Sequence, residues 1–373
     1  MANTSNAPSW GQTPWVIDFQ PRTAPLPEAV DVAIIGGGFT GLSAAAAIRS
    51  LNPDKTVAVF EAETIGARSS GYTGGLTLSE TAAGDLPGLG DVLAGLSEIT
   101  RQLHVTCELT LPGAWELDRT TETVESPICW SDSGQLRVAR EVPGGTVDPG
   151  KLVSGLGRAA AERGALLFEG SRVEHIDFAD PLTLEVGGRH VRAQRALVAT
   201  NSESLELSNL TGRAEPKLTL ALATESLSDA QLTALGLASG KPFYTTDLPY
   251  LWGRLLAGNR IIFGSGLVPV SHWRELKSID IRSGDPAAML ARLEKRVTKL
   301  HPALADFAFS HRWGGPILIA DRWRPVFTRH PRSERVIVLG AYSGHGVALS
   351  VYLGAWAAEA LLDRREPPAW HSD

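Results

Sequence analysis

The amino-acid sequence predicts an α/β protein, or α+β when its β-rich second lobe is counted, and three stretches indicate this fold class. Near the N-terminus, an apolar run from Asp31 to Ile35 ends in a glycine turn and continues into an alanine-rich helix. A second apolar run, glycine turn and helix lies between residues 335 and 362. Between them, residues 216–320 hold several β-prone runs and one amphipathic helix, Pro286 to Leu300, which is typical of a mixed or antiparallel sheet.

The first glycine turn has the spacing of a dinucleotide-binding motif. Gly36, Gly38 and Gly41 fit G-x-G-x-x-G, in which the glycines make the turn, admit a pyrophosphate and let the helix pack on the strand. A second apolar strand, Thr56 to Phe60, ends in Glu61, where a carboxylate accepts hydrogen bonds from an adenosine ribose and would repel a 2′-phosphate. We therefore expect a Rossmann-like layer that binds FAD or NAD rather than NADP. A strand-helix-strand unit without a ligand is the alternative.

The composition of the chain limits its possible partners, its location and its metal sites. The chain has 373 residues, a formal net charge of −6 and scattered basic residues, so we expect no nucleic-acid partner. No apolar segment reaches the ~18 to 20 residues that span a bilayer, and residues 1–27 lack the basic and apolar regions of a signal peptide, so a cytoplasmic protein is expected. Cys107 and Cys129 lack metal-ligand spacing, which predicts reduced thiols and no metal site.

Residues 66–75 are rich in small side chains, and we interpret them as a second close approach of the backbone to the cofactor, with a surface loop as the alternative. Helices are expected around 91–109 and over 151–163, and strands over 165–169, 172–177, 196–201, 217–224, 260–264 and 335–339. These elements divide the chain into an N-terminal arm pinned by Trp10 and Trp15 (1–28), a discontinuous α/β domain that carries both glycine turns (29–85, 147–212 and 321–366), a second, β-rich domain (86–146 and 213–320) and a tail (367–373).

The C-terminal turn is the most specific of several short motifs. They read Gly36-x-Gly38-x-x-Gly41 with Glu61, Ser70-Gly71-x-x-Gly74-Gly75, Val147-x-Pro149-x-x-Leu152, Ala199-Thr200-Asn201, Arg312-Trp313-Gly314-Gly315 and Gly340-x-x-Ser343-Gly344-His345-Gly346. Together they resemble the D-amino-acid oxidase superfamily of FAD enzymes, in particular its glycine/sarcosine oxidase and γ-glutamylputrescine oxidase group, over almost the whole chain. The helix after Gly346 could stabilise negative charge at the N1/C2=O edge of a reduced flavin.

The resemblance implies that the discontinuous domain (29–85, 147–212 and 321–366) is the FAD-binding domain and that the β-rich domain (86–146 and 213–320) is the substrate-binding domain. It also implies FAD contacts from the matched motifs and their neighbours. The expected cofactor-binding residues are Gly36, Gly38, Phe39, Thr40, Gly41, Glu61, Ala62, Arg68, Ser69, Ser70, Gly74, Gly75, Leu76, Val173, Ala199, Thr200, Asn201, Trp313, Gly315, Gly344, His345, Gly346, Val347 and Ala348. Sarcosine oxidases carry a substrate-anchoring lysine where this chain has Ala348, and a flavin-tethering cysteine near 314–317, where none stands here. We therefore expect non-covalent FAD. Tyr72-Thr73 replace the Arg-Asn of the γ-glutamylputrescine oxidase subgroup.

The activity implied by the resemblance is oxidation of a C–N bond in an amine or amino acid. Hydride passes to flavin N5, the imine hydrolyses, and O₂ is reduced to H₂O₂. A flavin dehydrogenase that uses another acceptor, and a non-catalytic FAD-binding subunit of an oxidase complex, are the alternatives. The expected catalytic residues are Tyr250, Trp252, Arg324, Tyr342 and His345, although Trp252 could be core and Arg324 a solvated surface side chain. Glu80 could attract a cationic amine.

Overall fold

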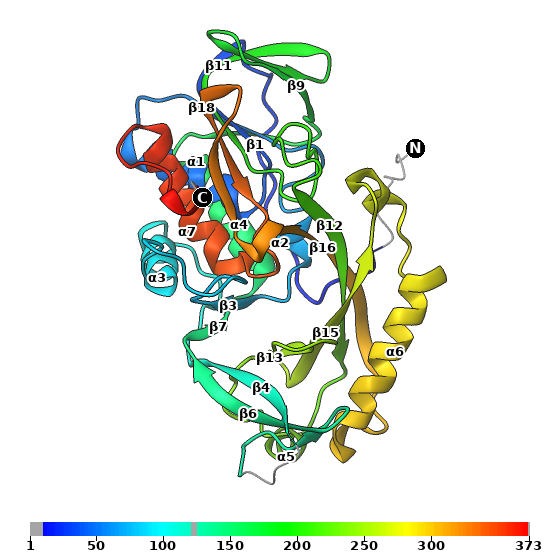
Figure 1. Cartoon of the computed structure of the whole chain (residues 1–373). Coiled ribbons are helices and arrows are strands. Elements are labelled where there is room, and N and C mark those ends of the chain that lie inside the picture. Colours follow the sequence, from blue (N-terminus) through cyan, green and yellow to red (C-terminus); the bar gives the residue numbers. More distant parts are fainter. Residues whose placement is uncertain (1–9, 121–124, 372–373) are drawn as a thin grey trace.

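The computed structural model describes residues 10–120 and 125–371 and contains two large mixed sheets in two lobes (Figure 1). Expectations for residues 1–9 and 372–373 lie outside these ranges. The described residues include no helix that is both long enough and apolar enough to cross a membrane. Within the same ranges, no group of His, Cys, Asp or Glu side chains could hold a metal ion.

The first sheet carries the N-terminal glycine turn and is mostly parallel. Its main strands, in spatial order, are β17 (Val326–His330), β18 (Ser333–Gly340), β11 (Arg189–Val198), β1 (Ala29–Ile35), β2 (Val57–Phe60) and β8 (Leu166–Phe168). Strands β9 (Val173–Asp177) and β10 (Leu182–Val186) extend it beside β11. Strands β1, β2, β8, β11 and β18 pair in parallel, and the buried faces of β1 and β2 are almost entirely apolar, as expected for a sheet covered on both sides.

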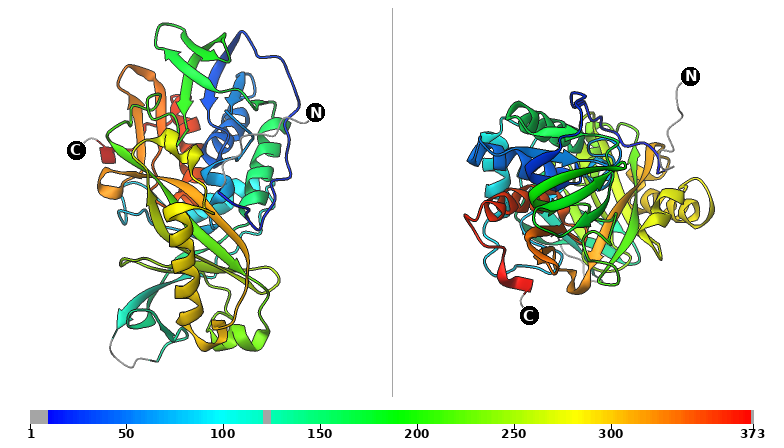
Figure 2. Two further views of the ribbon diagram at one scale, coloured as in Figure 1. Left: turned by 90° about the vertical axis from the view of Figure 1, so that its right-hand side faces the viewer. Right: turned by 90° about the horizontal axis from the view of Figure 1, so that it is seen from above.

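Helices α1 (Phe39–Leu51), α4 (Pro149–Glu162) and α7 (Gly346–Leu361) pack against the first sheet (Figures 1 and 2). Small residues bring α1 and α7 together, because a Cβ on Gly354 would lie 2.6 Å from the Thr40 carbonyl oxygen. Helix α3 (Val92–Gln102) also packs on α7, through Leu96 and its neighbours. Residues 92–102, which were expected in the substrate-binding domain, therefore contribute to the core of the first lobe.

The second sheet is mixed, as the sequence predicts. Its spatial order is β16 (Phe309–Ala320), β12 (Ala214–Thr224), β15 (Arg260–Pro269), β14 (Trp252–Leu256), β13 (Phe243–Thr245), β4 (Ala114–Thr120), β6 (Gln135–Val142) and β5 (Trp130–Ser131). All neighbours pair antiparallel except β13 and β4. Helix α6 (Gly284–Leu300) lies along this sheet and buries Leu290, Leu293 and Val297 (Figure 2). The α/β fold with a second mixed-sheet lobe is thus confirmed.

Several local expectations differ from the structure. The helix expected over 91–109 ends at Gln102, since His104 and Glu108 adopt left-handed backbone conformations with φ of 56° and 53°. The small-residue run contains one helical turn, α2 (Ser69–Tyr72), where we expected no helix. The strand expected to reach Asn201 ends at Val198. Remaining elements are β3 (Leu76–Leu78), β7 (Gly144–Thr146), α5 (Asp229–Ala234) and the 3₁₀ turns η1 (Trp273–Ser278), η2 (Pro302–Leu304), η3 (Asp321–Trp323) and η4 (Ala369–His371).

Two tryptophans hold the N-terminal arm, as expected. Trp10 is fully buried, and its indole N–H donates to the Leu276 carbonyl at 2.9 Å. Trp15 donates to the Gly71 carbonyl at 2.7 Å. The arm therefore contacts the second lobe through Trp10 and the glycine-rich segment through Trp15. Both cysteines are free thiols, and burial raises the pKa of Cys107 to about 11.

Candidate active site

Two connected cavities meet at the N-terminal glycine turn. The smaller, of about 80 Å³, lies at the ends of β1 and β2, and the larger, of about 880 Å³, extends to the second sheet. They share the lining residues Gly38, Ser69, Ser70, Ala199 and Asn201. One elongated ligand could therefore occupy both.

The glycine turn has the geometry that its motif requires. Gly36 has a φ of +111°, and a Cβ there would lie 2.6 Å from the Ala199 carbonyl oxygen. A Cβ on Gly41 would lie 2.0 Å from the Gly36 carbonyl oxygen, so Gly41 serves packing and lines neither cavity. Gly38 precedes α1 and has no side chain to cap it, and the first N–H of the helix, on Phe39, donates to Ser70 Oγ at 3.0 Å. The N-terminus of this buried helix faces the junction of the two cavities, which Gly38 and Ser70 line.

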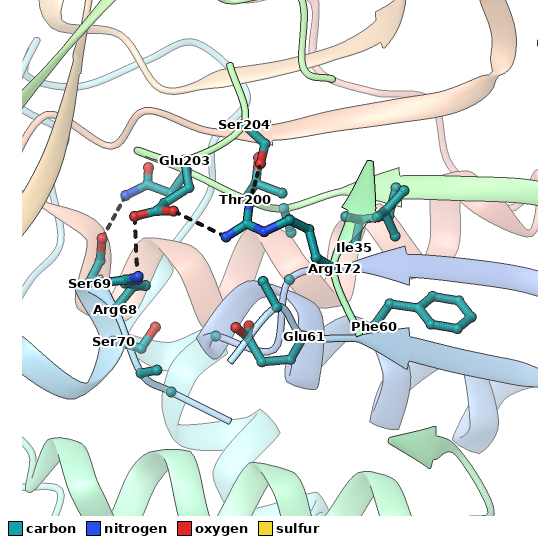
Figure 3. A pocket seen from close by; sticks show the side chains of 18 residues that line it. Ile35, Phe60, Glu61, Arg68, Ser69, Ser70, Arg172, Thr200, Glu203 and Ser204 are labelled. Atoms are coloured by element: carbon teal, nitrogen blue, oxygen red, sulfur yellow. Dashed lines mark hydrogen bonds and ion pairs between the residues drawn. The ribbon is translucent and has the colours of Figure 1, made fainter. Parts of the chain in front are cut away.

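Glu61 lines the smaller cavity beyond this turn (Figure 3). One carboxylate oxygen accepts from the Gly37 N–H at 2.8 Å and the other from the Glu63 N–H at 2.9 Å. These bonds hold the side chain across the turn. Burial raises the pKa of Glu61, and the two backbone N–H groups oppose that shift in part.

The other wall of the smaller cavity carries a charged network, of which the sequence indicated Arg68 and Thr200 but not Arg172 and Glu203 (Figure 3). Glu203 lies 3.3 Å from Arg68 Nε and 3.9 Å from Arg172 Nη2. Arg68 Nη1 and Thr200 Oγ1 are buried and have no hydrogen-bond partner among the described residues. Such groups are costly unless a ligand satisfies them. The only sequence signal was proximity, because Arg172 precedes Val173 and Glu203 follows Asn201.

Asn201 joins two of the glycine-rich segments. Its amide N–H donates to Ser69 Oγ at 3.0 Å, and its amide oxygen accepts from the Ala341 N–H at 2.9 Å. Ala341, Ser343 and Gly344 have positive φ values of 53°, 52° and 93°, so the C-terminal turn is tightly wound before α7 begins. The motifs of residues 69, 201 and 341 are therefore one structural unit.

The larger cavity gathers most of the remaining expected residues. Its lining includes the expected cofactor residues Phe39, Thr40, Gly74, Leu76, Trp313, Gly315, Gly344, Gly346 and Val347, the expected catalytic residues Tyr250, Trp252, Tyr342 and His345, and also Glu80. Ala62, Val173 and Thr200 line the smaller cavity. Tyr342 bonds Thr40 Oγ1 at 2.7 Å, and burial raises the pKa of its phenol.

Three further expected residues line neither cavity. Arg324 donates to the Trp370 carbonyl at 3.1 Å, so it fastens the C-terminal segment and does not reach the cavity where we expected it. Gly75 has a φ of +78° and packs against the Val147 carbonyl, where a Cβ would approach within 2.4 Å. Ala348 is 1% exposed in the core of the first lobe.

Trp252 forms the central wall of the larger cavity, in contact with two glycines. A Cβ on Gly74 would lie 2.2 Å from its ring, and a Cβ on Gly264 would lie 2.0 Å from it. The register pairs Trp252 with Gly264 across β14 and β15, so the absent side chain makes room for the indole. Cavity residues that the sequence did not indicate include Tyr72, Glu116, Arg140, Glu215, Lys217, Thr219, Tyr244, Leu267 and Trp323.

His345 begins α7 beside the larger cavity. The buried Nδ1 of its ring has no hydrogen-bond partner among the described residues. Burial lowers the pKa of His345, while the Ser343 backbone and the negative charge of Glu80 oppose that change. The imidazole is therefore neutral near pH 7 and can donate or accept one hydrogen bond.

The lowered pKa of His345 predicts a loss of stability in acid. The unfolded chain binds a proton near pH 6.5 and the folded chain only at lower pH, so the free energy of unfolding falls as pH decreases from 7 toward 5. We expect His345→Gln to reduce this slope, by at most about 1.4 kcal/mol per pH unit. Urea unfolding at fixed excess FAD measures it, with exposed His175→Gln as the control. Equal slopes for wild type and His345→Gln would contradict the assignment.

The residues around the two cavities fit a flavin dinucleotide. The N-terminus of α1 and the unpartnered Arg68 nitrogen suit a pyrophosphate, Glu61 suits a ribose, and the larger cavity can receive a ring system together with a substrate. The family model for FAD dependent oxidoreductases (DAO) matches residues 31–127 and 98–360. The chain belongs to this family, and FAD is its cofactor.

Known proteins are similar to this chain over most of its length. γ-Glutamylputrescine oxidoreductase of Escherichia coli K12 is 26% identical over 89% of this chain and 83% of its own length. Glycine oxidase from Geobacillus kaustophilus has a TM-score of 0.72 at 19% identity, covering 91% of this chain and 96% of that chain. L-Proline dehydrogenase from P. horikoshii has a TM-score of 0.73 at 17% identity, covering 93% and 97%. The two structures show that an oxidase and a dehydrogenase both have this fold.

Proposed function

We propose that this protein oxidises the C–N bond of an amine or amino acid and passes the electrons to O₂, giving H₂O₂. The supporting observation is the continuity of the nucleotide cavity with a large chamber walled by Trp252, Tyr250 and Trp313. When bound, FAD would accept a hydride from the carbon next to nitrogen, and the resulting imine would hydrolyse in water. The E. coli relative carries an amine substrate in its name, which supports this class of substrate.

The chain's own residues would hold the cofactor and exclude water. Gly38 and the N-terminus of α1 would face the pyrophosphate, with Arg68 nearby, and Glu61 would bind the ribose. The α7 N-terminus would face the flavin ring beside Gly344 and Val347. These assignments keep the hypotheses drawn from the motifs, except for Gly41, Gly75 and Ala348. Those three residues line neither cavity and pack against other parts of the first lobe.

The substrate amine must be neutral at nitrogen for hydride transfer, and the chamber suits that state. Burial lowers the pKa of His345 in this cavity, and the same loss of hydration would favour the neutral form of an amine bound beside it. Neutral His345, with its unpartnered Nδ1, could hydrogen-bond the amine and orient its C–H bond. Tyr342 is engaged by Thr40 and would position the turn that carries His345.

Absorbance spectroscopy tests this function and the mode of flavin attachment. We expect the purified protein to show flavin bands near ~370 and ~450 nm, and acid denaturation to release all the colour. Colour retained on the precipitated chain would contradict non-covalent binding. Anaerobic addition of an amine should bleach the flavin, and admission of air should restore it within seconds. Bleaching without reoxidation would indicate a dehydrogenase, and no bleaching by any amine or amino acid would indicate a non-catalytic subunit.

A further inference from the structure

A row of cavity-lining side chains crosses the second sheet. The strand register places Arg140 opposite Glu116, Glu116 opposite Tyr244, and Tyr244 opposite Trp252, on the neighbouring strands β6, β4, β13 and β14. All four line the larger cavity. Adjacent strands are about 5 Å apart. Tyr244 is therefore about 5 Å from the position of Trp252 along the row, and Glu116, one strand further, is about 10 Å from it. The row is aromatic beside Gly74 and charged at its far end.

Glu80 reaches the charged end from the first lobe. The Tyr244 hydroxyl lies 3.1 Å from a carboxylate oxygen of Glu80 and 3.1 Å from one of Glu116. One hydroxyl proton can serve only one of them at a time. Arg140 donates to both oxygens of Glu116, at 3.0 and 2.6 Å. Within residues 10–120 and 125–371, no Lys, Arg or His forms an ion pair with Glu80.

The charged end therefore has an uncompensated negative charge, since two carboxylates face one guanidinium. The pairing with Arg140 lowers the pKa of Glu116, which keeps it ionised. Burial, together with the charges of Glu80 and Glu116, raises the pKa of Tyr244, so its hydroxyl stays protonated. A second, independent feature of the same cavity is the buried Nδ1 of His345, which also lacks a partner. Both features call for a polar ligand with more than one polar group.

We infer that Glu80 and Tyr244 bind a second ammonium group of the substrate, so that this enzyme selects amines with a cationic group remote from the carbon being oxidised. The inference rests on the proposed amine oxidation and specifies its substrate class. A diamine would place one nitrogen near His345 and Trp252 and the other at Glu80, across the one to two strand spacings that separate them. A substrate with a carboxylate in place of the second ammonium group would be repelled by Glu80. Arg140 would not compensate for this repulsion, because it is paired with Glu116.

Three amines of equal length test this inference: 1,5-diaminopentane, pentylamine and 5-aminopentanoate. Their oxidation by the FAD-loaded enzyme is followed anaerobically through flavin bleaching. We expect kcat/KM for the diamine to exceed that for pentylamine by roughly 10- to 100-fold, the size of one charge-assisted hydrogen bond, and 5-aminopentanoate to be the poorest. Glu80→Gln should remove the diamine advantage, so that the ratio of kcat/KM for the diamine to kcat/KM for pentylamine falls to about one. Tyr244→Phe should reduce the advantage in part.

Glu141→Gln is the matched control, because Glu141 is next to Arg140 on β6 but pairs with Lys241 and does not line the cavity. This variant removes a carboxylate from the same strand, outside the cavity, and should leave the diamine advantage unchanged. Three results would contradict the proposed ammonium site without contradicting amine oxidation. They are equal kcat/KM for the diamine and pentylamine in wild type, a preference for 5-aminopentanoate, and an undiminished diamine advantage in Glu80→Gln. If no amine or amino acid reduces the flavin, the proposed function itself is wrong.

Discussion

Replacing Gly38 by valine should abolish FAD binding while leaving the apoprotein folded. Gly38 lies where the two cavities meet, and a Cβ there would come within 2.7 Å of Ser70 Oγ. Its backbone is extended, with φ of −87°, so valine is conformationally allowed but would fill the space at the open end of α1. We expect the dissociation constant for FAD to rise at least ~100-fold, as measured by fluorescence titration of apoprotein.

Two controls separate this effect from misfolding. Gly38→Ala should be intermediate in FAD affinity, because its smaller group obstructs less of the junction. Ala47→Val places the added methyl groups on a partly exposed position of the same helix and should bind FAD like wild type. Apo Gly38→Val should retain wild-type unfolding free energy within about 1 kcal/mol. Wild-type FAD affinity in Gly38→Val would show that the glycine turn does not approach the cofactor.

Replacing Gly264 by alanine should damage both stability and turnover through Trp252. The new Cβ would lie 2.0 Å from two atoms of the Trp252 ring, and the ring also packs so closely on Gly74 that a Cβ there would lie 2.2 Å from it, which limits how far the ring can move. Overpacking of this kind destabilises by about 1 to 3 kcal/mol. Because the displaced indole is the central chamber wall, we also expect kcat/KM for amines to fall at least ~100-fold. Urea unfolding and steady-state kinetics measure the two effects.

A second-site change provides the decisive comparison. Trp252→Phe shortens the ring, so the double variant Trp252→Phe/Gly264→Ala should recover most of the stability lost by Gly264→Ala alone. The coupling between the two substitutions should be at least about 1 kcal/mol, as for residues in direct contact. Additive losses would mean that the strain lies elsewhere in β15, and the assigned packing of Trp252 would be incorrect.

The sequence predicted the segments that bind through their backbone better than those that act through side chains. Glycine spacing around Gly36 and Gly344 is local, and a turn followed by a helix N-terminus requires only neighbouring residues. The fold class followed from the same local patterns. The position of Arg324 did not, because its contact with Trp370 depends on how the C-terminal segment returns to the first lobe.

The charged groups of the site were missed for a related reason. Glu116 and Tyr244 are 128 residues apart in sequence and become neighbours only through the parallel pairing of β4 with β13. Likewise, the assignment of Trp252 to cavity or core depends on its contacts with Gly264 and Gly74, which come from distant parts of the sequence. Pairing between strands that are far apart in the sequence produces no characteristic residue spacing, so no local pattern could have identified these contacts.

The position of β18 in the first sheet determines when this sheet can be completed during synthesis of the chain. Strand β1 lies near the N-terminus, but its neighbour β11 pairs on the far side with β18, which covers only Ser333–Gly340. While the chain emerges from the ribosome, residues 196–198 of β11, which lie beyond the segment paired with β10, lack their partner strand until residues 333–340 have been made. Exposed strand edges favour intermolecular pairing. We therefore expect truncation before residue 333 to yield aggregated chains, and chaperone demand to peak late in synthesis.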